Sequence, residues 1–263
     1  MIIDVHAHYN DERYNEDLDQ LMNTFRRENI YVINSATCPG DIDSAVSLAN
    51  KYSNMFVTVG IHPEYALESN DTEIDRIRML FTGGNNRKIL GIGETGLDYH
   101  YDYSEEQIAA QKTNFIKHLA LASELSKPVI VHNRDAHLDT MTILKEHLDT
   151  KRGALIHCYS GSSESVPEYV SMNCCFSIGG VVTFKNAKKL VEAVKVMPHE
   201  RILIETDCPY LTPEPFRGTR NDSGKTVYTI RKIAELLDLS YEYVCDMTAD
   251  NAKRFFEIDC HMY

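Results

Sequence analysis

The sequence predicts an α/β protein with one domain, residues 1–263, folded as a single (β/α)8 TIM barrel. Two observations predict this fold. Eight short apolar runs of strand type alternate with amphipathic stretches of helical type, as in a parallel sheet covered by helices on both faces. In addition, side chains of metal-ligand type lie at the ends of several runs, including the first and the eighth. A closed barrel makes the first and eighth strands neighbours.

The predicted strands are short apolar runs rich in isoleucine, valine and leucine. Their lengths suit strands better than helices. They cover residues 2–8, 31–37, 55–62, 89–94, 129–132, 154–157, 175–180 and 202–207.

Between these runs, apolar residues recur at helical spacing. The clearest helix follows Ser104, which can cap it with Gln107 completing a capping box, and runs to Leu125. Other helices are predicted over residues 41–52, 186–197, 226–237 and 248–256. His118 and His147 fall within predicted helices, and we expect both to be surface residues.

Composition and charge limit the classes of partner. The formal net charge of −12 repels a polyanion at long range, which argues against non-specific coating of duplex DNA or anionic membranes. No apolar stretch approaches the roughly 18 residues that span a bilayer, and polar residues interrupt the only early apolar run. The seven cysteines include no CxxC pair, which fits a reducing compartment. We expect a cytoplasmic protein without membrane association or an obligate protein partner.

Six side chains of metal-ligand type end five of the predicted strands. They are His6, His8, Glu94, His132, His157 and Asp207. His6 and His8 are two positions apart in a strand, so they point to the same face and can bind one ion together. Barrel active sites lie at the C-terminal ends of the strands, where all six residues are expected.

This ligand set predicts two divalent metal ions. A single catalytic zinc typically uses three protein ligands, whereas two ions about 3.5–4 Å apart would use all six. Mixed imidazole and carboxylate ligands suit zinc or manganese and, with more carboxylate and water, magnesium. Any one of these histidines alone is better explained as a hydrogen-bonded core residue, but the six together favour a metal centre.

These residues lie in motifs that resemble the TatD family, metal-dependent hydrolases of the amidohydrolase superfamily that are associated with DNase activity. The motifs are DVHAH at 4–8, GIHP at 60–63, GETGLDY at 93–99, HNRD at 132–135, HCYSG at 157–161, ETD at 205–207 and RGTRN at 217–221. They occur in order over nearly the whole chain.

The resemblance implies a role for each ligand. His6 and His8 would bind one metal with Asp207, His132 and His157 would hold the second, and Glu94 would bridge both. Asp207 has a second implied role, as the base that takes a proton from the metal-activated water. Glu94 and Asp207 are therefore the predicted catalytic residues.

Four further residues are predicted to contact substrate. The resemblance implies a phosphate contact for His62, although a hydrogen-bonded rim histidine is an equal alternative. Arg134 shares a strand face with His132 and suits bidentate phosphate binding, the alternative being a salt bridge to Asp98 or Asp135. Arg217 and Arg220 belong to a loop over residues 212–225 that carries local positive charge.

The chain departs from the family pattern directly after this loop. The usual proline-containing continuation is replaced by residues 222–226, DSGKT. This difference leaves the ligand set intact and bears on the range of substrates.

The leading functional prediction is a deoxyribonuclease that cleaves phosphodiester bonds of DNA or a short phosphodiester substrate. The same metal pair can polarise a carbonyl, so a deacylase acting on a carboxylic ester or amide is the alternative. A non-catalytic metal-binding scaffold is a third hypothesis, because fold alone does not guarantee activity.

Overall fold

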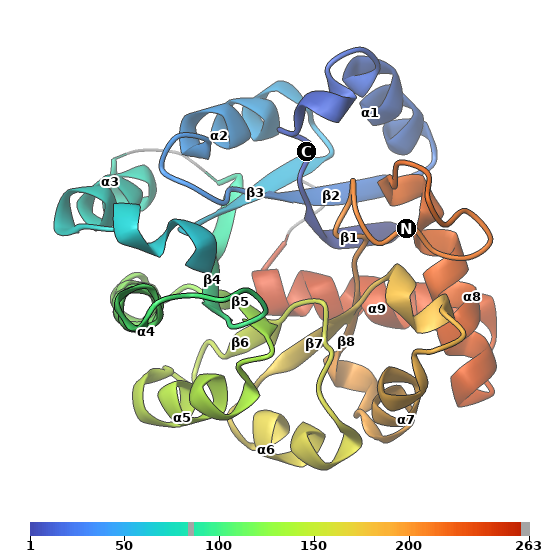
Figure 1. The fold of residues 1–263 in the computed structure, drawn as a ribbon. Coiled ribbons are helices and arrows are strands. Elements are labelled where there is room, and N and C mark those ends of the chain that lie inside the picture. The colour runs from blue at the N-terminus through green and yellow to red at the C-terminus, as the bar shows by residue number, and fades with distance from the viewer. Residues whose placement is uncertain (84–86, 259–263) are drawn as a thin grey trace.

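The computed structural model describes residues 1–83 and 87–258. Eight parallel strands pair in chain order and close into a barrel, because β1 pairs with β8 as well as with β2 (Figure 1). The strands are β1 (Ile2–Ala7), β2 (Ile30–Ser35), β3 (Met55–Val59), β4 (Ile89–Asp98), β5 (Val129–Arg134), β6 (Ala154–Ile156), β7 (Cys175–Ile178) and β8 (Ile202–Ile204). The predicted (β/α)8 barrel is confirmed.

Helices surround the strands as the chain passes round the barrel from blue to red in Figure 1. They are α1 (Leu18–Arg27), α2 (Ile42–Lys51), α3 (Asp71–Thr82), α4 (Glu105–Leu125), α5 (His137–His147), α6 (Val166–Ser171), α7 (Lys188–Val196), α8 (Thr226–Leu237) and α9 (Tyr241–Phe256). The predicted capping box of Ser104 and Gln107 opens α4. Helix α9 begins earlier than predicted because Ser240 provides its N-cap. No helix in the described part of the chain is long and apolar enough to cross a membrane.

Helix α9 covers the N-terminal end of the barrel. Its residues Ala249, Ala252 and Phe256 share one buried cluster with strand residues such as Val5 and Leu203. Figure 1 shows this helix passing behind the strands. Apolar side chains therefore fill this end, and the polar side chains discussed below lie at the opposite mouth, beyond the C-terminal ends of the strands.

The C-terminal ends of the strands differ from the prediction, and three of these differences bear on the candidate ligands. β4 continues through Asp98 and β5 through Arg134, because residues 95–98 pair with residues 131–134. β8 instead ends at Ile204. Consequently Glu94 lies within a strand rather than at its end, and Asp207 lies in the loop that follows β8.

His118 is a buried residue, so the prediction that it lies at the surface is wrong. Its Nε2 accepts the Ile61 backbone N–H at 3.1 Å, and its Nδ1 donates to the Asn114 carbonyl oxygen at 2.8 Å. It is fully buried on the same side of α4 as Phe115 and Ala122. His147 is exposed, as predicted.

Acid is expected to destabilise the protein through His118. Burial lowers the pKa of His118 from its ordinary 6.5 to about 4. Below about pH 6.5 the unfolded chain binds a proton that the folded chain binds only near pH 4. The stability contributed by neutral His118 is therefore complete above about pH 6.5 and is lost as the pH falls to about 4. This loss amounts to about 3 kcal/mol.

Urea unfolding of the wild-type and His118→Gln proteins, each at about pH 7 and about pH 4, measures this effect. Glutamine can still accept the Ile61 N–H, but it does not titrate. The free energy of unfolding should fall less with acid in the variant than in the wild type. An equal fall in both proteins would show that His118 does not carry the pH dependence.

Candidate metal centre

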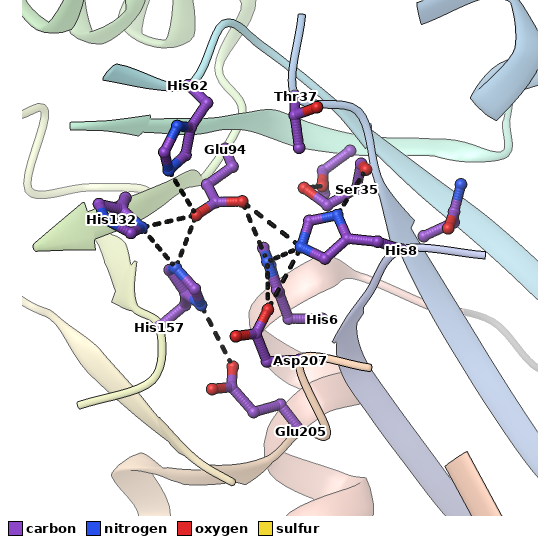
Figure 2. Close-up of polar contacts among 12 residues, drawn as sticks. His6, His8, Ser35, Thr37, His62, Glu94, His132, His157, Glu205 and Asp207 are labelled. Carbon is purple, nitrogen blue, oxygen red and sulfur yellow. Dashed lines mark hydrogen bonds and ion pairs between the residues drawn. The ribbon is translucent and has the colours of Figure 1, made fainter. Parts of the chain in front are cut away.

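Histidine and carboxylate side chains converge at the C-terminal mouth of the barrel (Figure 2). In the first group, His6 Nε2 and His8 Nε2 lie 3.2 Å apart. Asp207 Oδ1 lies 3.2 Å from His8 Nε2 and 3.8 Å from His6 Nε2. Glu94 Oε2 lies 3.2 Å from His6 Nε2 and 3.7 Å from His8 Nε2. Residues from β1, the position directly after it, β4 and the loop after β8 thus direct four donor atoms toward one another.

The second group faces the other carboxylate oxygen of Glu94. His132 Nδ1 and His157 Nε2 each lie 2.8 Å from Glu94 Oε1, and they are 3.3 Å from each other. His132 lies on β5, and His157 directly follows β6. Figure 2 shows Glu94 between the two groups. The structure therefore brings all six predicted ligands together, with one Glu94 oxygen toward each group.

Two glycines beside Glu94 let β4 approach β5 closely. Gly93 and Gly96 have positive φ angles of 139° and 141°. A Cβ atom on Gly96 would lie 2.1 Å from the His132 carbonyl oxygen, and one on Gly93 would lie 2.5 Å from that of Ile130. Glycine permits both the angle and the approach. This contact places the Glu94 side chain next to His132.

The histidines and carboxylates shift one another's pKa values. Burial opposes ionisation of Glu94, but the surrounding histidines outweigh it and hold the pKa of this carboxyl well below its usual range. Burial also opposes protonation of the histidines. Glu94 and Glu205 nevertheless raise the pKa of His157, and Asp207 and Glu94 raise the pKa of His8 to about 9. The carboxylates therefore favour positive charge at the centre of the cluster.

This donor set fits divalent metal ions. His8 Nδ1 lies 3.2 Å from the Ser35 carbonyl oxygen, and a hydrogen bond donated there leaves the Nε2 lone pair facing the cluster. Imidazole nitrogens and carboxylate oxygens are the ligands that zinc and manganese accept in proteins. Among residues 1–83 and 87–258, the close triplets of metal-ligand type are His6–Glu94–His157, His6–His8–Asp207 and His62–Glu94–His132.

His62 belongs to one of these triplets but is oriented as a hydrogen-bond donor. Its Nδ1 accepts the Glu64 backbone N–H at 3.2 Å, which places the proton of the neutral ring on Nε2. Burial and the neighbouring His132 lower the pKa of His62 to about 3, so the ring is neutral near pH 7. Its Nε2 lies 3.6 Å from Glu94 Oε1. Because that nitrogen carries the proton, His62 suits a substrate oxygen better than a metal ion.

Two buried carboxylates outside the predicted ligand set support the histidines. Asp98 Oδ2 lies 3.0 Å from His132 Nε2, which leaves His132 Nδ1 to face Glu94. Glu205 Oε2 accepts the Ser177 hydroxyl at 2.5 Å and lies 3.7 Å from His157 Nδ1. Carboxylates behind metal-binding histidines orient the ring and increase its basicity. The sequence signal for Glu205 was its position two residues before Asp207.

Glu205→Gln is expected to weaken metal binding at His157. Glutamine can still accept the Ser177 hydroxyl, but the negative charge behind His157 is lost. The expected decrease in metal affinity is about 10- to 100-fold. Competition with a chromophoric chelator measures it, with the exposed Glu200→Gln as the matched control. Equal affinities for the wild type and Glu205→Gln would exclude a positioning role for Glu205.

Arg134 lies at the end of β5 with its guanidinium exposed. Both alternative salt-bridge partners are engaged with histidines, Asp98 with His132 and Asp135 with His100. The salt-bridge alternative is therefore wrong, and no carboxylate of the described residues pairs with Arg134. The guanidinium is available at the mouth of the barrel.

The two loop arginines are placed differently from each other. Arg217 is exposed, and its guanidinium lies 3.9 Å over the Phe184 ring. Arg220 Nη1 donates to Asp17 Oδ1 at 2.9 Å and to the Arg13 carbonyl oxygen at 2.6 Å. Arg220 thus fastens the loop to the segment after β1. Substrate contacts by either arginine stay predictions.

The segment that departs from the family pattern forms a short 3-10 turn, Ser223–Lys225, which leads into α8. The Ser223 hydroxyl donates to Asp4 Oδ2 at 2.6 Å, and Lys225 pairs with Asp222. Asp4 Oδ2 also accepts the Thr206 hydroxyl at 2.6 Å. The divergent residues therefore fasten this loop to β1 beneath the candidate ligands.

Comparison with known proteins agrees with the motifs. A family model described as TatD related DNase matches residues 3–257. The chain is 41% identical over 261 residues to the uncharacterized metal-dependent hydrolase YabD of Bacillus subtilis strain 168, covering 98% of this chain and all of that protein. It is 33% identical over 264 residues to the uncharacterized metal-dependent hydrolase YcfH of Escherichia coli K12, covering 98% and 96%. The crystal structure of YjjV, a TatD homologue from Escherichia coli K12, superposes with a TM-score of 0.91 at 24% identity, covering 98% of each chain. The chain therefore belongs to the TatD family and is a metal-dependent hydrolase.

Proposed function

We propose that this hydrolase is a deoxyribonuclease that cleaves phosphodiester bonds with two divalent metal ions. The observation that carries the proposal is the Glu94 carboxylate, whose two oxygens face two separate groups of metal-ligand side chains. Paired metal sites occur in phosphatases and nucleases. The matching family model, described as TatD related DNase, favours DNA among phosphodiester substrates.

Six side chains would hold the two ions. His6, His8 and Asp207 would bind one ion, His132 and His157 the other, and Glu94 both. Divalent ions bound there would lower the pKa of a water molecule and polarise a phosphoryl oxygen. Side chains of the protein would carry out the remaining steps.

Asp207 would take the proton from the attacking water. Its side chain is 18% exposed, compared with 4% for Glu94, so it is the more accessible of the two central carboxylates. Burial opposes its ionisation, but the hydrogen bond and charge of His8 outweigh burial and hold the pKa of Asp207 below its usual value. An ionised carboxylate can accept a proton near neutral pH.

His62 and Arg134 would hold the phosphate. The His62 ring centroid lies 4.4 Å from that of His132, and Arg134 follows His132 by two residues on β5. A neutral N–H donor and an unpaired guanidinium both suit phosphate oxygens. These two groups favour phosphodiesters over the carboxylic esters or amides that the same metal pair can cleave.

The acidic charge of the chain favours a confined segment of DNA, such as the end of a strand. A net charge of −12 repels a long polyanion, whereas Arg134 lies locally at the mouth of the barrel. We therefore infer an exonuclease-like action on strand ends.

The test is digestion of single-stranded DNA labelled at either the 3′ or the 5′ end. Metal-stripped protein receives Mg²⁺, Mn²⁺ or Zn²⁺, and Glu94→Ala serves as the inactive control. Metal-restored shortening that the substitution abolishes would support the nuclease and show which end is attacked. Absence of cleavage with every metal, together with turnover of acyl esters or amides, would replace the proposal with a deacylase.

A further inference from the structure

We propose that Tyr101 and Arg134 form a nucleobase-stacking site beside the metal centre, so that an unstacked nucleotide is the unit this enzyme binds. The inference rests on the proposed function and names the class of substrate for the same site. Tyr101 lies in the loop between β4 and α4, and Arg134 ends β5.

The β4–α4 loop is held against the end of β5. The Tyr99 backbone N–H donates to the Arg134 carbonyl oxygen at 2.9 Å, and the Tyr99 hydroxyl donates to Asp139 at 2.8 Å. His100 Nδ1 lies 2.9 Å from Asp135 Oδ2. These contacts fix the loop on both sides of the strand end, so the side chain that follows is positioned before any ligand binds.

Tyr101 is exposed on this loop. Its side chain is 57% exposed, and its ring makes edge contacts with His100 at 5.1 Å and Tyr103 at 6.0 Å between centroids. A large, exposed aromatic ring on a fixed loop is a platform on which any base can stack, because every base has a π face.

Arg134 supplies charge at the same place. Its guanidinium carbon lies 5.6 Å from the Tyr101 ring centroid, near the outer limit of a cation–π contact. Because no described carboxylate pairs with it, the guanidinium is free to bind phosphate while the base lies on Tyr101. A ring with an unpaired cation over it offers groups for both parts of a nucleotide.

The platform adjoins the reacting centre. Arg134 and His132 are two residues apart on β5, which is about 7 Å along a strand. Asp98 connects them: on β4 it is the register partner of Arg134, and its Oδ2 lies 3.0 Å from His132 Nε2. A base on Tyr101 would therefore belong to a nucleotide next to the phosphate at the metals.

A second exposed tyrosine at this mouth lacks the same chemistry. Tyr210 is 51% exposed and lies under Arg13, whose guanidinium carbon is 4.5 Å from the ring centroid. Arg13 is held by Asp11 through bonds of 2.7 and 2.8 Å, so its charge is already neutralised. The observations therefore favour Tyr101.

Stacking on Tyr101 requires a base that is not stacked on its neighbours, as in a single strand or a frayed end, rather than continuous duplex.

The experiment compares two fluorescently labelled strands that resist cleavage, a phosphorothioate oligothymidylate and the same backbone with abasic sugars. Their affinities for the metal-loaded protein are measured by fluorescence anisotropy. Tyr101→Ala should weaken binding of the base-bearing strand by at least about fivefold, the smaller effect expected from losing one base–aromatic stack. Its affinity for the abasic strand should match that of the wild type.

Two further variants keep the result interpretable. Tyr101→Phe retains the ring and should bind both strands like the wild type. Tyr243→Ala removes a tyrosine of similar exposure, 52%, from α9 at the other end of the barrel and should change neither affinity. The stacking site is overturned if the wild type binds both strands equally, or if Tyr101→Ala binds the base-bearing strand as tightly as the wild type.

Cleavage of methyl p-nitrophenyl phosphate by the wild type tests the proposed function separately, because this phosphodiester has no nucleobase. Turnover without base-dependent binding would retain the phosphodiesterase and reject the stacking site. Binding that depends on Tyr101 without turnover would retain the nucleotide site and reject the phosphodiesterase.

Discussion

Replacing Glu94 with glutamine is expected to remove bound metal and abolish turnover while the protein stays folded. The carboxylate is almost completely buried and lies between His6, His8, His132 and His157. An amide supplies one oxygen, and its other side is an NH₂ group that would face imidazole lone pairs. The loss of affinity should exceed the roughly 10- to 100-fold expected from losing an outer contact to a metal ligand.

Metal content after dialysis, measured by inductively coupled plasma mass spectrometry, tests this expectation together with turnover of a model phosphodiester. Glu106→Gln, an exposed change on α4, is the matched control and should keep both metal and activity. Circular dichroism establishes that the Glu94 variant is folded. If Glu94→Gln kept two ions per chain and wild-type turnover, Glu94 could not be the bridging ligand.

The barrel could be predicted because its signal is repeated along the chain. Each apolar run is unremarkable alone, but their alternation with amphipathic stretches leaves few arrangements that bury all of them. The ligand positions then follow, since strands of one barrel end at the same mouth. His6 and Asp207, about 200 residues apart in sequence, meet because β1 and β8 close the barrel.

The orientation of Glu94 between two groups could not be predicted from local sequence. It depends on the register of β4 against β5, where Gly96 pairs with His132, and on the close approach that Gly93 and Gly96 allow. The same register brings Asp98 to His132. Strand register is set by the packing of the whole barrel, so local sequence patterns identified the donors, and only the family resemblance implied how they are grouped.

The surface charges were harder to interpret for a related reason. Arg220 carries the same charge as Arg134 and lies in a loop that reads as a basic patch, but it pairs with Asp17. That contact joins segments 203 residues apart.

His118 is a different case, because its spacing from Phe115 and Ala122 on α4 already places it on the apolar face. The helical periodicity around His118 therefore predicts burial, in contrast to the expected surface position.

Replacing Asp207 with asparagine is expected to reduce turnover by about 10²- to 10⁴-fold, the usual contribution of a general base. Asp207 has a positive φ of 54°, a conformation that asparagine adopts about as readily as aspartate. Its backbone N–H donates to the His6 carbonyl oxygen at 3.0 Å, a bond that the substitution keeps. Asparagine also retains an oxygen that can face His8, so the change removes basicity with little change in shape.

Metal content and turnover must be measured on the same Asp207→Asn preparation, because Asp207 is both a candidate ligand and the candidate base. The His132–His157–Glu94 group does not include Asp207, and it should keep its ion. Loss of one ion would assign Asp207 chiefly to binding, and turnover should then recover at high metal concentration. Retention of both ions with the expected fall in turnover would assign it to proton transfer. Wild-type turnover with both ions bound would exclude Asp207 as the base.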